Sequence, residues 1–177
     1  MLRTYKFRIE PTKEQREKIN ETLMHCRRLY NALLEQRITA YKKCGVSLTF
    51  YSQKEELPTL KKVCEEYKSV HSQVLQNVAE RLDKAYQAFF RRVKHGQKAG
   101  FPRFKGMNRY RSFTYPQKGF HLKANTSRYP KLEAFESNCI DRCRVQSKHA
   151  QSSPKMDGIT FVCLVKLKRK HEQQGKG

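Results

Sequence analysis

Two long stretches of the chain repeat their apolar residues every three or four positions, which is the spacing of an amphipathic helix. The first begins at a capping-box pattern, with Thr12 three residues before Gln15, and it ends at Gly45. The second covers residues 72–94 and is followed by Gly96. Because an amphipathic helix must cover its apolar face, these stretches predict a helical bundle at the centre of the fold.

Shorter patterns lie around these two helices. Residues 2–10 alternate between polar and apolar side chains, as a half-buried strand does, and Pro11 ends the alternation. A second capping-box pattern at residues 52–55 predicts a short helix that Pro58 closes, and residues 59–67 predict one more.

Beyond the second long helix the apolar period shortens to that of strands, at residues 112–115 and 158–165. The Ser- and Gln-rich segments between them carry little pattern, and we expect the C-terminal part to be poorly ordered. The sequence therefore predicts an α+β fold, with an N-terminal strand, a helical bundle and then short strands.

Charge is distributed very unevenly along the chain. The 177 residues carry a formal net charge of +22, yet no acidic residue lies between Asp83 and Glu133. Thirteen basic residues and ten of the nineteen aromatic residues fall in that interval. Cations that neutralise phosphates and rings that stack on bases give this mixture, so nucleic acid is the partner we expect.

The candidate contact residues come mostly from this interval. An alternative is that the rings belong to the core and the cations are merely solvated. For phosphate contacts the candidates are Lys6, Arg8, Arg91, Arg92, Arg103, Lys105, Arg109 and Arg111, and for base stacking they are Phe101, Phe104, Phe113 and Tyr115.

The sequence gives less support for a membrane or small-molecule partner, for a metal site or for catalysis. No run of about 18 apolar residues exists to span a bilayer, and glycines and prolines interrupt the basic interval, so we expect a cytoplasmic protein without membrane or small-molecule partners. Cys139 and Cys143 lack the two-residue gap of common zinc sites. No set of carboxylates or nucleophile with its own histidine is visible, so we expect no metal, no cofactor and no catalytic residue.

Several motifs occur in the order found in one family. They are the opening residues 5–15, the helix segment 28–34, and Gly-Phe-Pro-Arg-Phe-Lys at residues 100–105 followed by Ser-Phe-Thr-Tyr at residues 112–115. Over residues 2–120 the chain resembles the N-terminal part of the TnpB (OrfB-type) transposases of bacterial insertion sequences.

The resemblance implies a transposon-associated protein with a helix-turn-helix or recognition region that grips guide RNA or transposon DNA. It implies a wedge-like barrel whose first strand is residues 2–10, a helical part over residues 12–95, and a basic extended part, residues 98–118, that returns into the barrel. Complete family members also carry a RuvC-like nuclease domain and a zinc ribbon.

The resemblance stops near residue 121. Residues 121–177 diverge from the family, and a frameshift near residue 121 would explain the change. We expect a nucleic-acid-binding fragment, residues 1–120 with a divergent tail, that does not cleave by itself. The alternative is an independent basic RNA-binding accessory or inhibitor protein.

Overall fold

The computed structural model describes backbone and side chains over residues 11–116. It gives backbone alone for five strands, which are β1 (Leu2–Glu10), β2 (His121–Lys123), β3 (Lys131–Glu133), β4 (Arg144–Gln146) and β5 (Val162–Lys168). The divergent tail therefore lies largely outside the described residues, as does the predicted strand at 158–165 except for its overlap with β5.

The first long helix, α1 (Lys13–Cys44), has the boundaries that the sequence predicts. The Gln15 N–H donates to Thr12 Oγ1 at 3.3 Å, and the Thr12 N–H donates to Gln15 Oε1 at 3.0 Å. At the other end Gly45 adopts a left-handed conformation with φ of 66°, and its N–H donates to the Tyr41 carbonyl oxygen. Both end signals are local, which is why the sequence reveals them.

The second helix, α2 (Phe50–Val63), differs from its prediction at both ends. Its N-cap is Thr49, paired reciprocally with Ser52, and Pro58 lies inside the helix instead of closing it. Leu57 is buried and Leu60 packs against the core, so apolar contacts on both sides of Pro58 offset its missing N–H. The separate helix predicted over residues 59–67 is wrong, because residues 59–63 continue α2 and a 3₁₀-helix, η1 (Glu65–Ser69), follows.

The third helix, α3 (Ser72–Lys94), confirms the second long pattern. His71 caps it, because its Nδ1 accepts from the Gln73 N–H at 3.2 Å. Gly96, with φ of 63°, follows the end of the helix.

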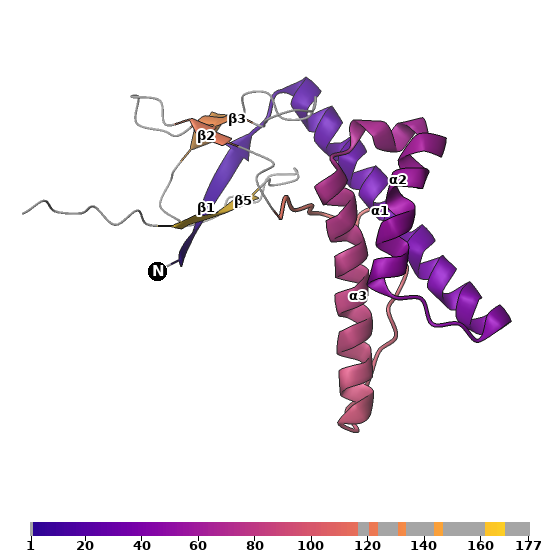
Figure 1. The fold of residues 1–177 in the computed structure, drawn as a ribbon. Coiled ribbons are helices and arrows are strands. Elements are labelled where there is room, and N and C mark those ends of the chain that lie inside the picture. Colours follow the sequence, from indigo (N-terminus) through magenta and orange to yellow (C-terminus); the bar gives the residue numbers. More distant parts are fainter. Residues whose placement is uncertain (1, 117–120, 124–130, 134–143, 147–161, 169–177) are drawn as a thin grey trace, which may run out of the picture.

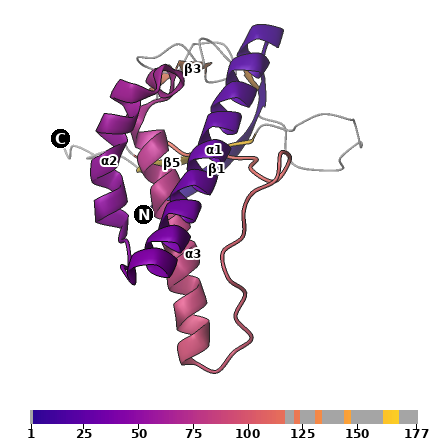
Figure 2. The same ribbon diagram turned by 90° about the vertical axis from the view of Figure 1, so that its right-hand side faces the viewer.

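The core lies where α1, α2 and α3 pack together (Figure 1). α1 crosses α3 at an angle, α2 lies on one side of the pair, and the C-terminal end of α3 extends beyond the other two helices (Figure 2). The residues that are almost fully enclosed include Cys26, Leu34, Val70, Val74, Leu75, Val78 and Leu82.

The strands form two separate ladders. β1 lies between β4 and β5 and is antiparallel to both, and β2 pairs with β3. Neither ladder includes residues 100–115.

The predicted α+β class with a wedge-like barrel is wrong for the unit that the structure describes in full. Across residues 11–116 every regular element is helical, and no sheet or barrel forms there. Residues 112–115, predicted as a strand, are extended but pair with no strand. The reason is that Arg81 of α3 binds Ser112 and Thr114, and Phe113 and Tyr115 pack against the helical core.

Candidate nucleic-acid interface

The basic segment after α3, residues 98–116, runs back along the helices as an extended chain (Figure 2). It contains Gly100, Pro102 and Gly106, which favour turns over regular structure. An extended chain outside a β-ladder has free backbone groups, so its position depends on the groups that bind them. Two helix side chains, Asn31 and Arg81, bind backbone groups of this segment.

The first of these is Asn31 on α1. Its Nδ2 donates to the Lys105 carbonyl oxygen at 3.0 Å, and its Oδ1 accepts from the Lys105 N–H at 2.8 Å. A side-chain amide paired with both backbone groups of one residue imitates one rung of a β-ladder. The Lys105 ammonium lies 5.4 Å from the ring centroid of Tyr30, which holds this side chain over α1 as well.

The second is Arg81 on α3. Its Nη1 donates to the Ser112 carbonyl oxygen at 2.6 Å, and its Nη2 donates to Thr114 Oγ1 at 2.8 Å. The same guanidinium lies 5.7 Å from the ring centroid of Tyr110. Arg81 therefore holds the segment against α3.

Tyr110 anchors the segment in the core. The side chain is buried, and its ring lies 6.2 Å from that of Tyr30. Burial raises the pKa of the Tyr110 phenol to about 12, and the Arg81 charge acts in the opposite direction. The phenol therefore remains neutral at physiological pH and serves packing.

The four predicted stacking residues divide into two pairs. Phe113 and Tyr115 are partly buried against the core, and Tyr115 also meets the ring of His71 at 5.4 Å. Phe101 and Phe104 are 46% and 53% exposed, so ring area on both remains open to a partner. The structure thus separates rings that pack from rings that a partner can reach.

The predicted cations also occupy different settings. Arg91 and Arg92 are exposed in the last turn of α3, and Arg103 and Arg109 are exposed on the segment. Arg111 is exposed too, although its Nε donates to the Asn108 carbonyl oxygen at 2.7 Å. The remaining two, Lys6 and Arg8, belong to β1, where the structure describes only the backbone.

A hollow of about 430 Å³ lies beside the end of α3. Its lining includes Tyr86, Phe89 and Phe90 from α3, Tyr41 from α1, and Phe101 from the segment. Sequence reasoning identified only Phe101 as a site residue here. The others stand in two helices about fifty positions apart, and nothing in their local pattern shows that they meet.

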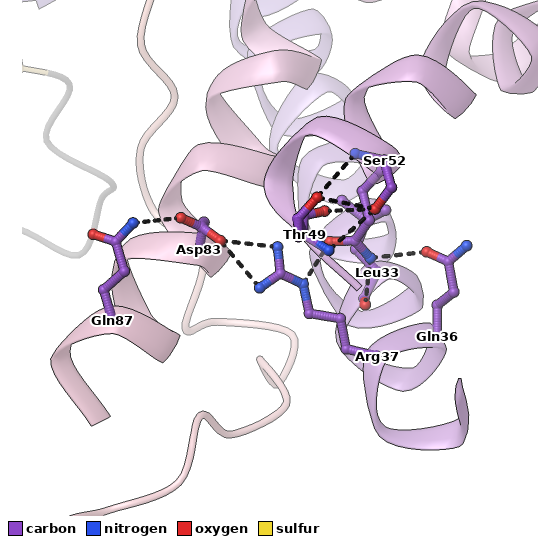
Figure 3. Close-up of polar contacts among 8 residues, drawn as sticks. Leu33, Gln36, Arg37, Thr49, Ser52, Asp83 and Gln87 are labelled. Carbon is purple, nitrogen blue, oxygen red and sulfur yellow. Dashed lines mark hydrogen bonds and ion pairs between the residues drawn. The ribbon is translucent and has the colours of Figure 1, made fainter. Parts of the chain in front are cut away.

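A polar network supports one wall of this hollow (Figure 3). The buried Arg37 donates from Nε to Gln53 Oε1 at 2.7 Å and from Nη2 to Asp83 Oδ1 at 3.1 Å. It therefore joins α1 to both α2 and α3. The guanidinium also lies 5.0 Å from the ring centroid of Tyr86, which fixes that ring in the wall.

A metal cluster and a membrane-spanning helix are both absent from the part of the chain that the structure describes. No group of three or more His, Cys, Asp or Glu in this part of the chain could hold a metal ion. No helix in it combines the length and the apolar character needed to cross a membrane.

Comparisons with known proteins agree with the family resemblance. The family model of a helix-turn-helix domain, HTH_OrfB_IS605, matches residues 1–45. InsQ of Escherichia coli (strain K12), described as a candidate RNA-guided DNA endonuclease, is 30% identical over 135 residues. This chain belongs to the TnpB/OrfB family of insertion-sequence transposases, in its N-terminal portion.

The extent of these matches limits what they cover. The aligned part is 74% of this chain and 32% of InsQ, so the chain spans about a third of its TnpB/OrfB relative. The helix-turn-helix match contains β1 and the whole of α1, and it ends at Gly45, where the chain turns toward α2.

Proposed function

We propose that residues 11–116 are a nucleic-acid-binding module of a TnpB-like transposase, with a contact surface made by residues 98–111 and the last turn of α3. One observation carries this proposal. Among the residues that the structure describes, the ion pairs with an acidic partner involve cations no later than Lys84. Within residues 11–116, the cations from Arg91 to Arg111 form no ion pair with a carboxylate.

This distribution matters because exposed cations on a folded scaffold repel one another. The end of α3 and the segment place eight cations, from Arg91 to Arg111, along one stretch of chain that contains no acidic residue. A polyanion relieves the repulsion and releases its own condensed counterions on binding. A phosphate backbone is the polyanion that fits an extended row of charges.

The placement of individual residues refines the proposed contacts. Arg103, Arg109 and Arg111 on the segment, with Arg91 and Arg92 on α3, are exposed and suit phosphate contacts. Lys105 contributes less, because its main chain and ammonium already engage α1. Phe101 and Phe104 are the stacking candidates, whereas Phe113 and Tyr115 contribute packing. Lys6 and Arg8 remain proposed phosphate contacts on β1.

The family relationship supports nucleic acid of an insertion sequence as the ligand, either transposon DNA or an RNA partner. InsQ is described as an RNA-guided DNA endonuclease, and the present chain aligns with a third of it. We propose that this chain binds without cutting, because the acidic residues after position 84 form no recognisable catalytic set in the sequence.

A salt titration of the full 177-residue chain tests the binding proposal. Affinity for a fluorescein-labelled oligonucleotide, measured by anisotropy, should fall linearly on logarithmic axes as salt rises. Arg103→Ala and Arg109→Ala should each reduce the slope by roughly 0.7 to 0.9. Lys62→Ala is the matched control, because this exposed lysine lies on α2. Equal slopes for all four proteins would overturn the proposed surface.

A second experiment tests the absence of cleavage. The same chain is incubated with Mg²⁺ and labelled single-stranded or duplex DNA, and the products are separated by denaturing electrophoresis. Intact substrate at saturating protein is the expected result. Cleavage that persists through repurification would show that the chain is an enzyme.

A further inference from the structure

The proposed phosphate contacts do not involve the aromatic hollow beside the end of α3. The Phe101 ring meets Tyr86 at 5.5 Å and Phe89 at 5.4 Å, both edge to face. These contacts hold the first ring of the basic segment against α3. The aromatic cluster is therefore a fixed structure that joins the segment to the helix.

Three rings of this cluster still have much of their surface open. Tyr41 is 67% exposed, Phe90 is 59% exposed and Phe101 is 46% exposed, although all three line the same hollow. Rings that only completed the core would be covered, as Tyr30 and Tyr110 are. The open ring surface is available to a flat apolar partner.

The charges around the hollow indicate what kind of partner that is. Lys42 and Arg37 line it, and no acidic residue does. On α3, Lys94 lies beside the row formed by Tyr86, Phe90 and Val93, because successive residues turn by about 100° around a helix. The hollow is apolar inside and cationic at its edge.

We propose that this hollow receives one unpaired base of a single-stranded nucleic acid, stacked on the ring of Phe90 or Phe101. A base has a flat ring system and a phosphate on either side of its nucleotide, which matches an aromatic floor with cations at the rim. The proposal rests on the nucleic-acid-binding function above and adds to it a preference for single strands.

The buried Arg37 has a positioning role in this site. Its donors are taken by Gln53 and Asp83, and it supports Tyr86 from behind. Lys42, in contrast, is exposed and has no carboxylate partner among the described residues. The cation closest to the bound nucleotide is therefore Lys42.

The test compares single-stranded and duplex oligonucleotides of one sequence, each carrying a single 2-aminopurine, on the full chain. Phe90→Leu removes the exposed ring but keeps an apolar side chain, so the fold is retained. It should weaken single-strand binding roughly 5- to 100-fold and abolish the quenching of 2-aminopurine that stacking causes. Duplex affinity should change less than twofold. Tyr51→Leu, at an exposed tyrosine on α2, is the matched control.

Different failures have different meanings. Unchanged single-strand affinity in Phe90→Leu, with duplex binding intact, overturns the base site and leaves the nucleic-acid-binding function standing. Absence of binding to either oligonucleotide by the unaltered chain overturns both. Equal losses in Phe90→Leu and Tyr51→Leu also contradict a specific site. If Phe90→Leu instead dissociates a dimer in sedimentation, the occupant is a second copy of the chain, and the base site is wrong.

Discussion

The side-chain amide of Asn31 and the main chain of Lys105 bind each other reciprocally, although 74 positions separate them. This pair fixes the middle of the basic segment to α1. Arg81 fixes the segment further along, at Ser112 and Thr114. Between and beyond these points the arginines stay exposed, so the scaffold holds the backbone of the segment and leaves the charges at the surface.

Replacing Asn31 with alanine should therefore release the segment more than it weakens the helical core. Two partly buried hydrogen bonds are lost, which should lower the free energy of unfolding by about 1 to 2 kcal/mol. Hydrogen exchange at the Lys105 amide should accelerate strongly, since its acceptor is gone. Asn20→Ala, at an exposed position of α1, provides the comparison. Unaltered exchange at Lys105 would contradict the assigned role.

Arg37 should be the most sensitive polar residue of the unit. Arg37→Ala leaves Asp83 without its cation and the buried Gln53 without its donor, so we expect a loss of about 3 kcal/mol. Arg37→Lys should recover only part, because one ammonium lacks the planar fork that reaches both partners. Urea unfolding followed by circular dichroism measures both, with the exposed Arg16→Ala as control. A neutral effect of Arg37→Ala would be the contrary result.

The ends of α1 and the Arg37 ion pair show which features the sequence could reveal and which it could not. The ends of α1 were predictable because Thr12, Gln15 and Gly45 form their contacts within one turn of the helix. Arg37 pairs with Asp83 across 46 positions, and neither residue differs in sequence from an ordinary surface charge. Composition located the basic surface, whereas only packing shows which of its members hold the fold.

The predicted barrel failed for a related reason. Residues 112–115 have the alternating pattern of a strand, and that pattern also suits any extended chain with one face on a core. Arg81 and the helical core take the hydrogen bonds and apolar contacts that a neighbouring strand would have provided. The sequence pattern specifies an extended backbone, and it does not specify the partner.

Tyr110 makes the unit sensitive to alkaline pH. Its pKa rises from 10 to about 12 on burial, so the folded state holds the proton more tightly than the unfolded state does. The resulting stabilisation is complete below pH 10 and is lost as the pH rises toward 12. Tyr110→Phe should reduce this alkaline loss of stability by up to about 3 kcal/mol, with little change at pH 7. Tyr51→Phe, at an exposed tyrosine, should leave the pH profile unchanged.

The left-handed conformation of Gly45 at the end of α1 should make this position sensitive to substitution. Its φ of 66° is unfavourable for a residue with a Cβ atom, yet a Cβ built there would meet nothing within 4 Å. Gly45→Ala should therefore cost about 1 kcal/mol from backbone strain alone. Gly100→Ala, where space is equally open and φ is ordinary, should be neutral.

The position of Gly45 links this strain to binding. Its N–H donates to the Tyr41 carbonyl oxygen, and Tyr41 and Lys42 line the hollow. If the last turn of α1 frays to relieve the strain, Gly45→Ala should speed hydrogen exchange in residues 41–44 and weaken single-strand binding modestly, with duplex binding unchanged. Gly45→Asn should lie between alanine and glycine, because asparagine tolerates the left-handed conformation. Equal stability of the alanine variants at positions 45 and 100 would contradict the strain argument.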